Sequence, residues 1–219
     1  MIHERECWSC GAVTGGAPFC PGCNLIQPPE PGMDPFALLA LPRAFQVDRD
    51  QLDNVYRERQ QQFHPDRFAL RSIQERRYSL EQVTQLNEAW RTVRDPLQRG
   101  TCLLHLLRGE GTLAAAVAPD GGGDMARDPV FLMEAMEMRE GLAEISTRSA
   151  QAGEQLAALR QDVERRIEAE MAALESLFSP LMAVSPTPET LEAVERHLNR
   201  LRYHQRFVEE LDRLEEQVG

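Results

Sequence analysis

Residues 60–70, QQQFHPDRFAL, place a His-Pro-Asp triplet between two segments with helical patterning. The helical segment before the triplet begins near Asp48. Gln51 follows three residues later, which is the spacing of a capping box at a helix N-terminus. This helix must end near His64, because Pro65 has no backbone N–H to donate and its ring clashes with the preceding turn. The stretch therefore predicts a helical hairpin whose two helices are joined by a short, rigid loop.

Apolar residues recur every three or four positions on both sides of the triplet, as they do in amphipathic helices. The helix that follows the triplet is expected at residues 72–94. Asp34-Pro35 and Asp95-Pro96 begin two shorter helices, because each is a capping residue followed by a proline suited to the first turn. The expected core-facing residues of the hairpin are Leu52, Val55, Tyr56, Phe63, Ile73, Leu80, Val83, Asn87, Trp90 and Val93.

The C-terminal part of the chain has the pattern of a three-helix bundle. Three amphipathic segments, at about residues 129–148, 154–178 and 188–217, are joined by short turns that contain Gly or Pro. We therefore predict an all-α fold with five parts: a cysteine module, a Pro-rich linker, the hairpin body, a connector with three consecutive glycines, and the bundle. These parts are residues 1–26, 27–33, 34–109, 110–127 and 128–219, respectively.

Four of the five cysteines lie in two knuckles, CWSC at residues 7–10 and CPGC at residues 20–23. Two CxxC pairs bring four sulfurs to one tetrahedral ion, which is the usual arrangement of a structural zinc site. A pair of disulfides and an iron site are the alternatives, but nothing in the sequence indicates an oxidising compartment. The predicted zinc ligands are Cys7, Cys10, Cys20 and Cys23.

Charge and hydropathy limit the classes of partner. The formal net charge of the 219 residues is −11, which disfavours binding to the phosphate backbone of nucleic acids. No run of eighteen apolar residues is present, and the start, MIHERECW, has neither a secretory nor a transit pattern. We expect a cytoplasmic protein with no nucleic-acid or membrane partner. A zinc ribbon that binds nucleic acid and a CxxC redox protein are the competing classes.

The triplet itself allows three interpretations: a catalytic histidine, a turn that merely ends a helix, or a recognition loop. No nucleophile motif or acidic pair accompanies His64, which argues against an enzyme. An HPD triplet within a helical hairpin resembles the J-domain of DnaJ-type co-chaperones. The segments FALLALPRAFQVDRDQL, FHPDRF, LNEAWRTVRDPLQRGTCLLHLLRG and DPVFLMEAMEMREGL resemble the HscB family of iron-sulfur cluster co-chaperones. The tetracysteine module resembles that of the zinc-carrying members of the family.

The resemblance implies that the triplet binds an HscA/DnaK-type chaperone and stimulates its ATP hydrolysis. Arginines near the triplet are candidates to steer the loop to an acidic surface of that chaperone, although a solvated helix face explains them as well. The expected chaperone-binding residues are His64, Pro65, Asp66, Arg57, Arg59 and Arg67.

Residues 131–145, FLMEAMEMREGLAEI, carry more apolar side chains than one helix face can bury. One side is a core stripe of Phe131, Ala135, Met138, Leu142 and Ile145. The opposite side either packs on the hairpin body or forms an adaptable, Met-rich partner surface. The resemblance implies the second, because this helix binds the scaffold protein IscU in the HscB family. The expected scaffold-binding residues are Leu132, Met133, Met136, Glu137, Glu140, Glu144 and Tyr203. The alternative for Tyr203 is an ordinary aromatic residue buried in the core.

The sequence thus favours a co-chaperone that delivers IscU to an HscA/DnaK-type chaperone and promotes iron-sulfur cluster transfer. A J-domain protein with a different client is the nearest alternative. The tetracysteine module is also a candidate homodimer interface.

Overall fold

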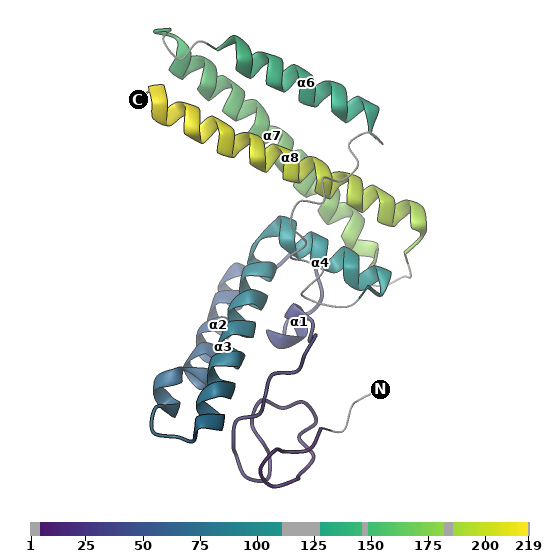
Figure 1. Ribbon diagram of the computed structural model, residues 1–219. Coiled ribbons are helices and arrows are strands. Elements are labelled where there is room, and N and C mark those ends of the chain that lie inside the picture. The colour runs from purple at the N-terminus through teal and green to yellow at the C-terminus, as the bar shows by residue number, and fades with distance from the viewer. Residues whose placement is uncertain (1–4, 111–127, 146–148, 182–185, 219) are drawn as a thin grey trace. The chain divides into compact units, whose positions relative to one another are not determined.

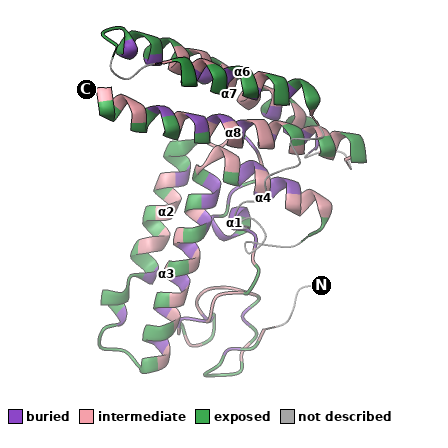
Figure 2. Cartoon of the chain, turned by 45° about the horizontal axis from the view of Figure 1, so that its top comes forward, coloured by how far each residue is buried: buried purple, intermediate pink, exposed green. Residues whose placement is uncertain are grey.

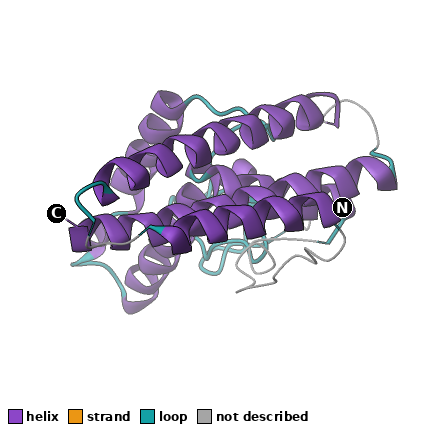
Figure 3. Ribbon diagram, turned by 90° about the horizontal axis from the view of Figure 1, so that it is seen from above, coloured by secondary structure: helices purple, strands orange, loops and turns teal. Residues whose placement is uncertain are grey.

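The computed structural model describes four stretches of the chain (Figure 1). They are residues 5–110, 128–145, 149–181 and 186–218. Within these stretches the backbone forms helices and loops with no strand (Figure 3), apart from two isolated β-bridges. The all-α fold predicted from the sequence is therefore confirmed. None of the helices in these stretches is long and apolar enough to cross a membrane.

Contacts divide the described residues into two compact units. The first comprises residues 5–43 and 47–110, and the second comprises residues 44–46 and 128–218. The short segment 44–46 belongs to the second unit, where the ring of Phe45 stacks on that of Phe178 with centroids 5.1 Å apart. The connector expected at residues 110–127 lies almost entirely outside the described residues.

Side-chain caps fix where the helices of the first unit begin. The carboxylate of Asp48 accepts the N–H groups of Asp50 and Gln51 at 2.9 and 3.1 Å. Ser72 and Glu75 form a reciprocal capping box at the start of the long helix after the triplet. Figure 1 shows α2 and α3 side by side as the expected hairpin. The helical elements described in this unit are α1 (Pro35–Leu38), α2 (Arg49–Phe63), η1 (Pro65–Phe68), α3 (Ile73–Arg94) and α4 (Pro96–Arg108).

The buried face of α3 differs from the expected stripe. Ile73 and Leu80 are 78% and 60% exposed, and Val93 is the only buried member of that stripe. The buried face is largely polar, because its side chains find hydrogen-bond partners inside the unit. Ser79, for example, donates its hydroxyl to the carbonyl of Phe63 at 2.6 Å. The buried residues of α3 are Glu75, Ser79, Gln82, Leu86, Ala89, Thr92 and Val93.

The second unit is a bundle in which each helix has buried positions along one side (Figure 2). Its described helices are α6 (Pro129–Glu144), α7 (Ala152–Leu181) and α8 (Pro188–Val218). The predicted core stripe of α6 is confirmed, since four of its members are buried and Ile145 packs against the core. A central apolar cluster joins the three helices and contains Met138, Leu142, Leu156, Val163, Phe207 and Leu211.

Ion pairs also join the helices of the bundle. Arg160 of α7 makes a bidentate pair with Glu215 of α8 at 2.9 and 2.8 Å. Arg200 of α8 contacts the carboxylate of Asp128, the N-cap of α6, at 2.6 Å and lies over the ring of Phe131. Burial raises the pKa of Asp128, but the Arg200 guanidinium outweighs this effect and lowers that pKa overall. These contacts hold the start of α6 against α8.

His204 on α8 is a buried polar residue that the apolar pattern does not reveal. Its ring is 2% exposed and makes edge contacts with the rings of Phe131 and Tyr203. Nδ1 of this ring has no hydrogen-bond partner in the described part of the chain. Burial lowers the pKa of His204 to about 4, so the folded bundle holds the imidazole in its neutral form.

We expect the free energy of unfolding of the bundle to fall as the pH drops from about 6.5 to about 4. In this interval the unfolded chain binds a proton that folded His204 excludes, and the loss reaches about 3 kcal/mol. Urea unfolding monitored by circular dichroism at pH 7 and pH 4.5 measures it. His204→Met should remove this component; an unchanged pH dependence in that variant would assign the effect to other groups.

Candidate functional site

The four predicted metal ligands converge in the first unit. All four Sγ atoms lie within 4.8 Å of one another. The pairs Cys7–Cys23 and Cys10–Cys20 are each separated by 3.6 Å. Four sulfurs bound to one tetrahedral zinc ion at about 2.3 Å stand about 3.8 Å apart. The cysteine group therefore has the donor chemistry and the size of a metal site.

The thiols of this group differ in acidity. Burial raises the pKa of Cys7, but the N–H groups of Cys10 and Ser9 and the neighbouring thiols outweigh it and hold that pKa at about 6. The N–H of Leu25 lowers the pKa of Cys23, yet burial and the other thiols raise it to about 12. Four thiolates this close together repel one another, so the full set needs the positive charge of a bound ion.

The His-Pro-Asp triplet lies on an exposed turn where α2 ends and η1 begins. His64 caps both elements, and its Nδ1 accepts the backbone N–H of Asp66 at 3.3 Å. The side chains of His64 and Asp66 are 50% and 91% exposed. Pro65 fixes the backbone between them. An imidazole and a carboxylate are thus presented to solvent on a short, well-defined loop.

The three arginines near the triplet differ in exposure. Arg57 and Arg67 are exposed, and they donate to the carbonyls of Asp53 at 3.1 Å and Gln61 at 3.3 Å. Arg59 is half-buried, and burial lowers its pKa. Arg57 and Arg67 therefore keep their charge accessible to a partner, whereas Arg59 is less available.

The six predicted residues of α6 lie together on its exposed face. Leu132, Met133 and Met136 are 40%, 65% and 54% exposed. Three exposed glutamates, at positions 137, 140 and 144, continue the same face toward the end of the helix. Val130, 65% exposed and three residues before Met133, extends the apolar patch. Its spacing in the sequence identifies it as a further member of the surface.

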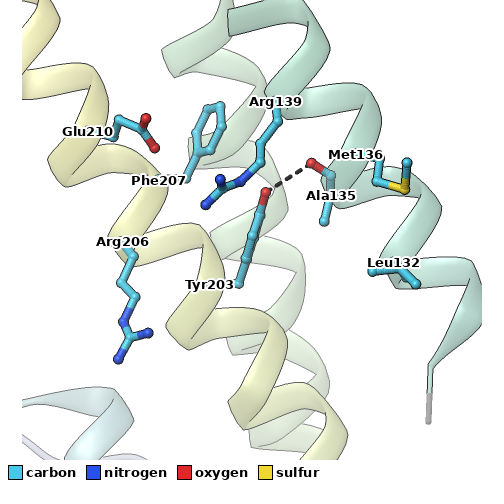
Figure 4. Close-up of a pocket in the computed structure, with 8 residues that line it drawn as sticks. All are labelled: Leu132, Ala135, Met136, Arg139, Tyr203, Arg206, Phe207 and Glu210. Atoms are coloured by element: carbon cyan, nitrogen blue, oxygen red, sulfur yellow. Dashed lines mark hydrogen bonds between the residues drawn. The ribbon is translucent and has the colours of Figure 1, made fainter. Parts of the chain in front are cut away.

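A groove of about 330 Å³ between α6 and α8 borders this patch (Figure 4). Tyr203 lies in its wall, half-buried, and donates its hydroxyl to the carbonyl of Ala135 at 2.9 Å. The groove also contains charged residues that the sequence analysis did not select, because no spacing rule relates positions on α6 to positions on α8. Its lining residues are Leu132, Ala135, Met136, Arg139, Tyr203, Arg206, Phe207 and Glu210.

Comparison with known proteins identifies the family. Residues 127–212 match the sequence-family model described as the HSCB C-terminal oligomerisation domain. The iron-sulfur cluster co-chaperone protein HscB of Homo sapiens is 30% identical over 210 residues, which cover 94% of this chain and 80% of the human protein. The chain belongs to the HscB family of co-chaperones. The mouse HscB protein is 36% identical over 149 residues, and that match covers 66% of this chain and 60% of the mouse protein.

Solved structures of HscB proteins share the fold. The crystal structure of human co-chaperone protein HscB superimposes with a TM-score of 0.80 and 30% sequence identity, covering 95% of this chain and 97% of that chain. Chaperone HscB from Vibrio cholerae gives a TM-score of 0.69 at 29% identity, with 85% and 100% coverage. The family resemblance inferred from the sequence is therefore confirmed over nearly the whole chain.

Proposed function

We propose that this HscB-family protein binds the iron-sulfur scaffold protein IscU and delivers it to an HscA/DnaK-type chaperone, whose ATP hydrolysis it stimulates. In this account residues 34–109 act as the J-domain and residues 128–219 as the scaffold-binding bundle. The protein performs no chemistry of its own; it brings two partners together and biases the state of one of them.

The exposed loop at His64 is the observation that carries the proposal. Its imidazole and carboxylate lie on a turn fixed by a proline and two helix ends, so binding a partner costs little additional conformational entropy of the backbone. Binding that favours the hydrolysis-competent state of the chaperone over its alternative shifts the chaperone population toward that state. Arg57 and Arg67, both exposed, would add attraction to an acidic chaperone surface.

The exposed face of α6 supports the scaffold-binding part of the proposal. Methionine side chains adapt to the shape of a partner, and glutamates at the edge of the patch select basic groups opposite them. With a volume of about 330 Å³, the groove beside Tyr203 is large enough to receive one apolar side chain of the scaffold.

We expect Met133→Asp combined with Met136→Asp to weaken IscU binding by about 100-fold, because two carboxylates would be buried against an apolar contact. Isothermal titration calorimetry with purified IscU measures this loss. Leu80→Asp is the matched control, since Leu80 is 60% exposed on α3 and belongs to the other unit. Equal affinity of the double variant and the wild type would place the scaffold elsewhere.

A further inference from the structure

The tetracysteine module contacts the hairpin at the end that carries the HPD triplet. Phe19, directly before the second knuckle, stacks on Phe63 with ring centroids 5.9 Å apart and planes inclined by 25°. Phe63 is the last residue of α2 and immediately precedes His64. Its side chain is 1% exposed, whereas Phe19 is half-buried. The module therefore packs against Phe63. We call Phe63 the anchor of the triplet, because it is buried directly before His64.

Further contacts hold the linker that follows the module on α3. Gln82 and Gln85 donate their side-chain amides to the carbonyls of Gln27 and Glu30 at 3.0 and 2.9 Å. Gln82 is buried, so loss of its partner would leave a polar group unpaired in the interior. Residues 27–33, expected from the sequence to be an extended linker, are thus attached to the hairpin at two points.

Phe63, the anchor of the triplet, is held by contacts with both the module and α3. The ring of Phe63 contacts the module, and its carbonyl accepts the hydroxyl of Ser79 on α3. A groove of about 260 Å³ lies beside the anchor, and residues of the module, α2 and η1 line it together, among them Phe19, Gln62 and Phe68. Displacement of Phe19 would uncover the ring of Phe63, which is 1% exposed, directly before the loop.

We propose that the metal-loaded tetracysteine module positions the HPD triplet for the chaperone, and that Phe19 is the positioning residue that connects the two. A module of this size buries too little apolar surface to fold without its ion. Phe19 is bonded to Cys20, one of the four ligands, so the ion fixes its place. Loss of the metal would then leave the loop of the triplet less ordered. The functional consequence of this inference rests on the proposed stimulation of the chaperone.

Amide hydrogen exchange of the loop, measured by NMR on the zinc-loaded protein, tests the coupling directly. The N–H groups of Arg67, Ala69 and Arg71 donate within the loop to the carbonyls of His64, Asp66 and Phe68. Phe19→Ala should make these three amides exchange about fivefold faster, as loss of one aromatic pair predicts. Exchange rates equal to those of the wild type would overturn the proposal.

Three comparisons make the exchange result specific. Val13→Ala, at a position in the module that is 53% exposed, should leave the loop amides unchanged. Phe19→Tyr should restore the protection, because it keeps the ring. Zinc content is measured for each variant. If Phe19→Ala binds less than one zinc ion, Phe19→Leu is used in its place.

Removal of zinc from the wild type with a chelator tests the role of the metal. It should make the same amides exchange faster, and unchanged exchange would contradict that role.

Chaperone stimulation then separates positioning from function. Phe19→Ala should stimulate ATP hydrolysis less than the wild type does and bind IscU equally well. Reduced loop protection with full stimulation would show that the loop need not be ordered, and would overturn the functional part of the inference. Should the wild type fail to stimulate the chaperone, the proposed function fails, and the exchange rates still decide whether Phe19 positions the loop.

Discussion

His64→Gln is expected to reduce stimulation of an HscA/DnaK-type chaperone by about tenfold or more, the loss typical of a central contact residue. Glutamine keeps a polar side chain of similar length but lacks the imidazole that accepts the N–H of Asp66 and faces solvent. Because the His64 side chain is half-exposed, the variant should fold normally. Steady-state ATP hydrolysis measures the effect, with variant and wild type compared at the same co-chaperone concentration, below that at which the wild type saturates the chaperone.

The matched control for this variant is His105→Gln. His105 lies on α4 of the same unit and pairs with Glu110 at 2.9 Å, and its side chain is 25% exposed. We expect His105→Gln to stimulate the chaperone as the wild type does and both variants to bind IscU with unchanged affinity. Equal stimulation by His64→Gln and the wild type would mean that the triplet is only a turn that ends α2.

Zinc removal is the second change with a large expected effect. Structural zinc in small modules contributes about 10 kcal/mol or more at neutral pH, which exceeds what the few buried apolar residues of the cysteine module supply. We expect the protein to bind one zinc ion, and a chelator to release it and make the module sensitive to protease while the helices of both units stay folded. Zinc quantification, limited proteolysis and far-ultraviolet circular dichroism follow these three events.

Cysteine variants distinguish a metal site from a redox site. Cys20→Ser should abolish stoichiometric zinc binding, because four thiolates are needed to close the tetrahedron. Cys102→Ala is the control: Cys102 lies alone on α4, and burial raises the pKa of its thiol to about 11, so it should not affect the zinc content. Two disulfides formed in air, with no bound zinc, would support the redox alternative.

The sequence predicted those parts of the fold where apolar residues alone decide burial. Phe131, Ala135, Met138 and Leu142 form the core stripe of α6 as expected, and the opposite face is exposed. On α3 the prediction was wrong at Ile73 and Leu80, because polar side chains occupy the interior face. Ser79 and Gln82 donate to the carbonyls of Phe63 and Gln27, which lie 16 and 55 positions away, and no periodicity within one helix reveals such partners.

Contacts between distant segments account for the site residues that were missed. Arg139 and Glu210 both line one groove although they lie on different helices. The stacking of Phe19 on Phe63 joins two parts of the chain that the sequence analysis treated as separate. Both arrangements depend on how helices and loops come together, whereas the cysteine spacing and the HPD triplet are local and were recognisable at once.

In the proposed function one protein connects a scaffold to a chaperone. The most direct test of this connection is ATP hydrolysis by the HscA-type chaperone in the presence of the zinc-loaded protein, with and without IscU. We predict stimulation by the protein alone and, with IscU present, an increase greater than the sum of the separate effects. The absence of stimulation in both conditions, from protein that carries its zinc and binds IscU, would contradict the account.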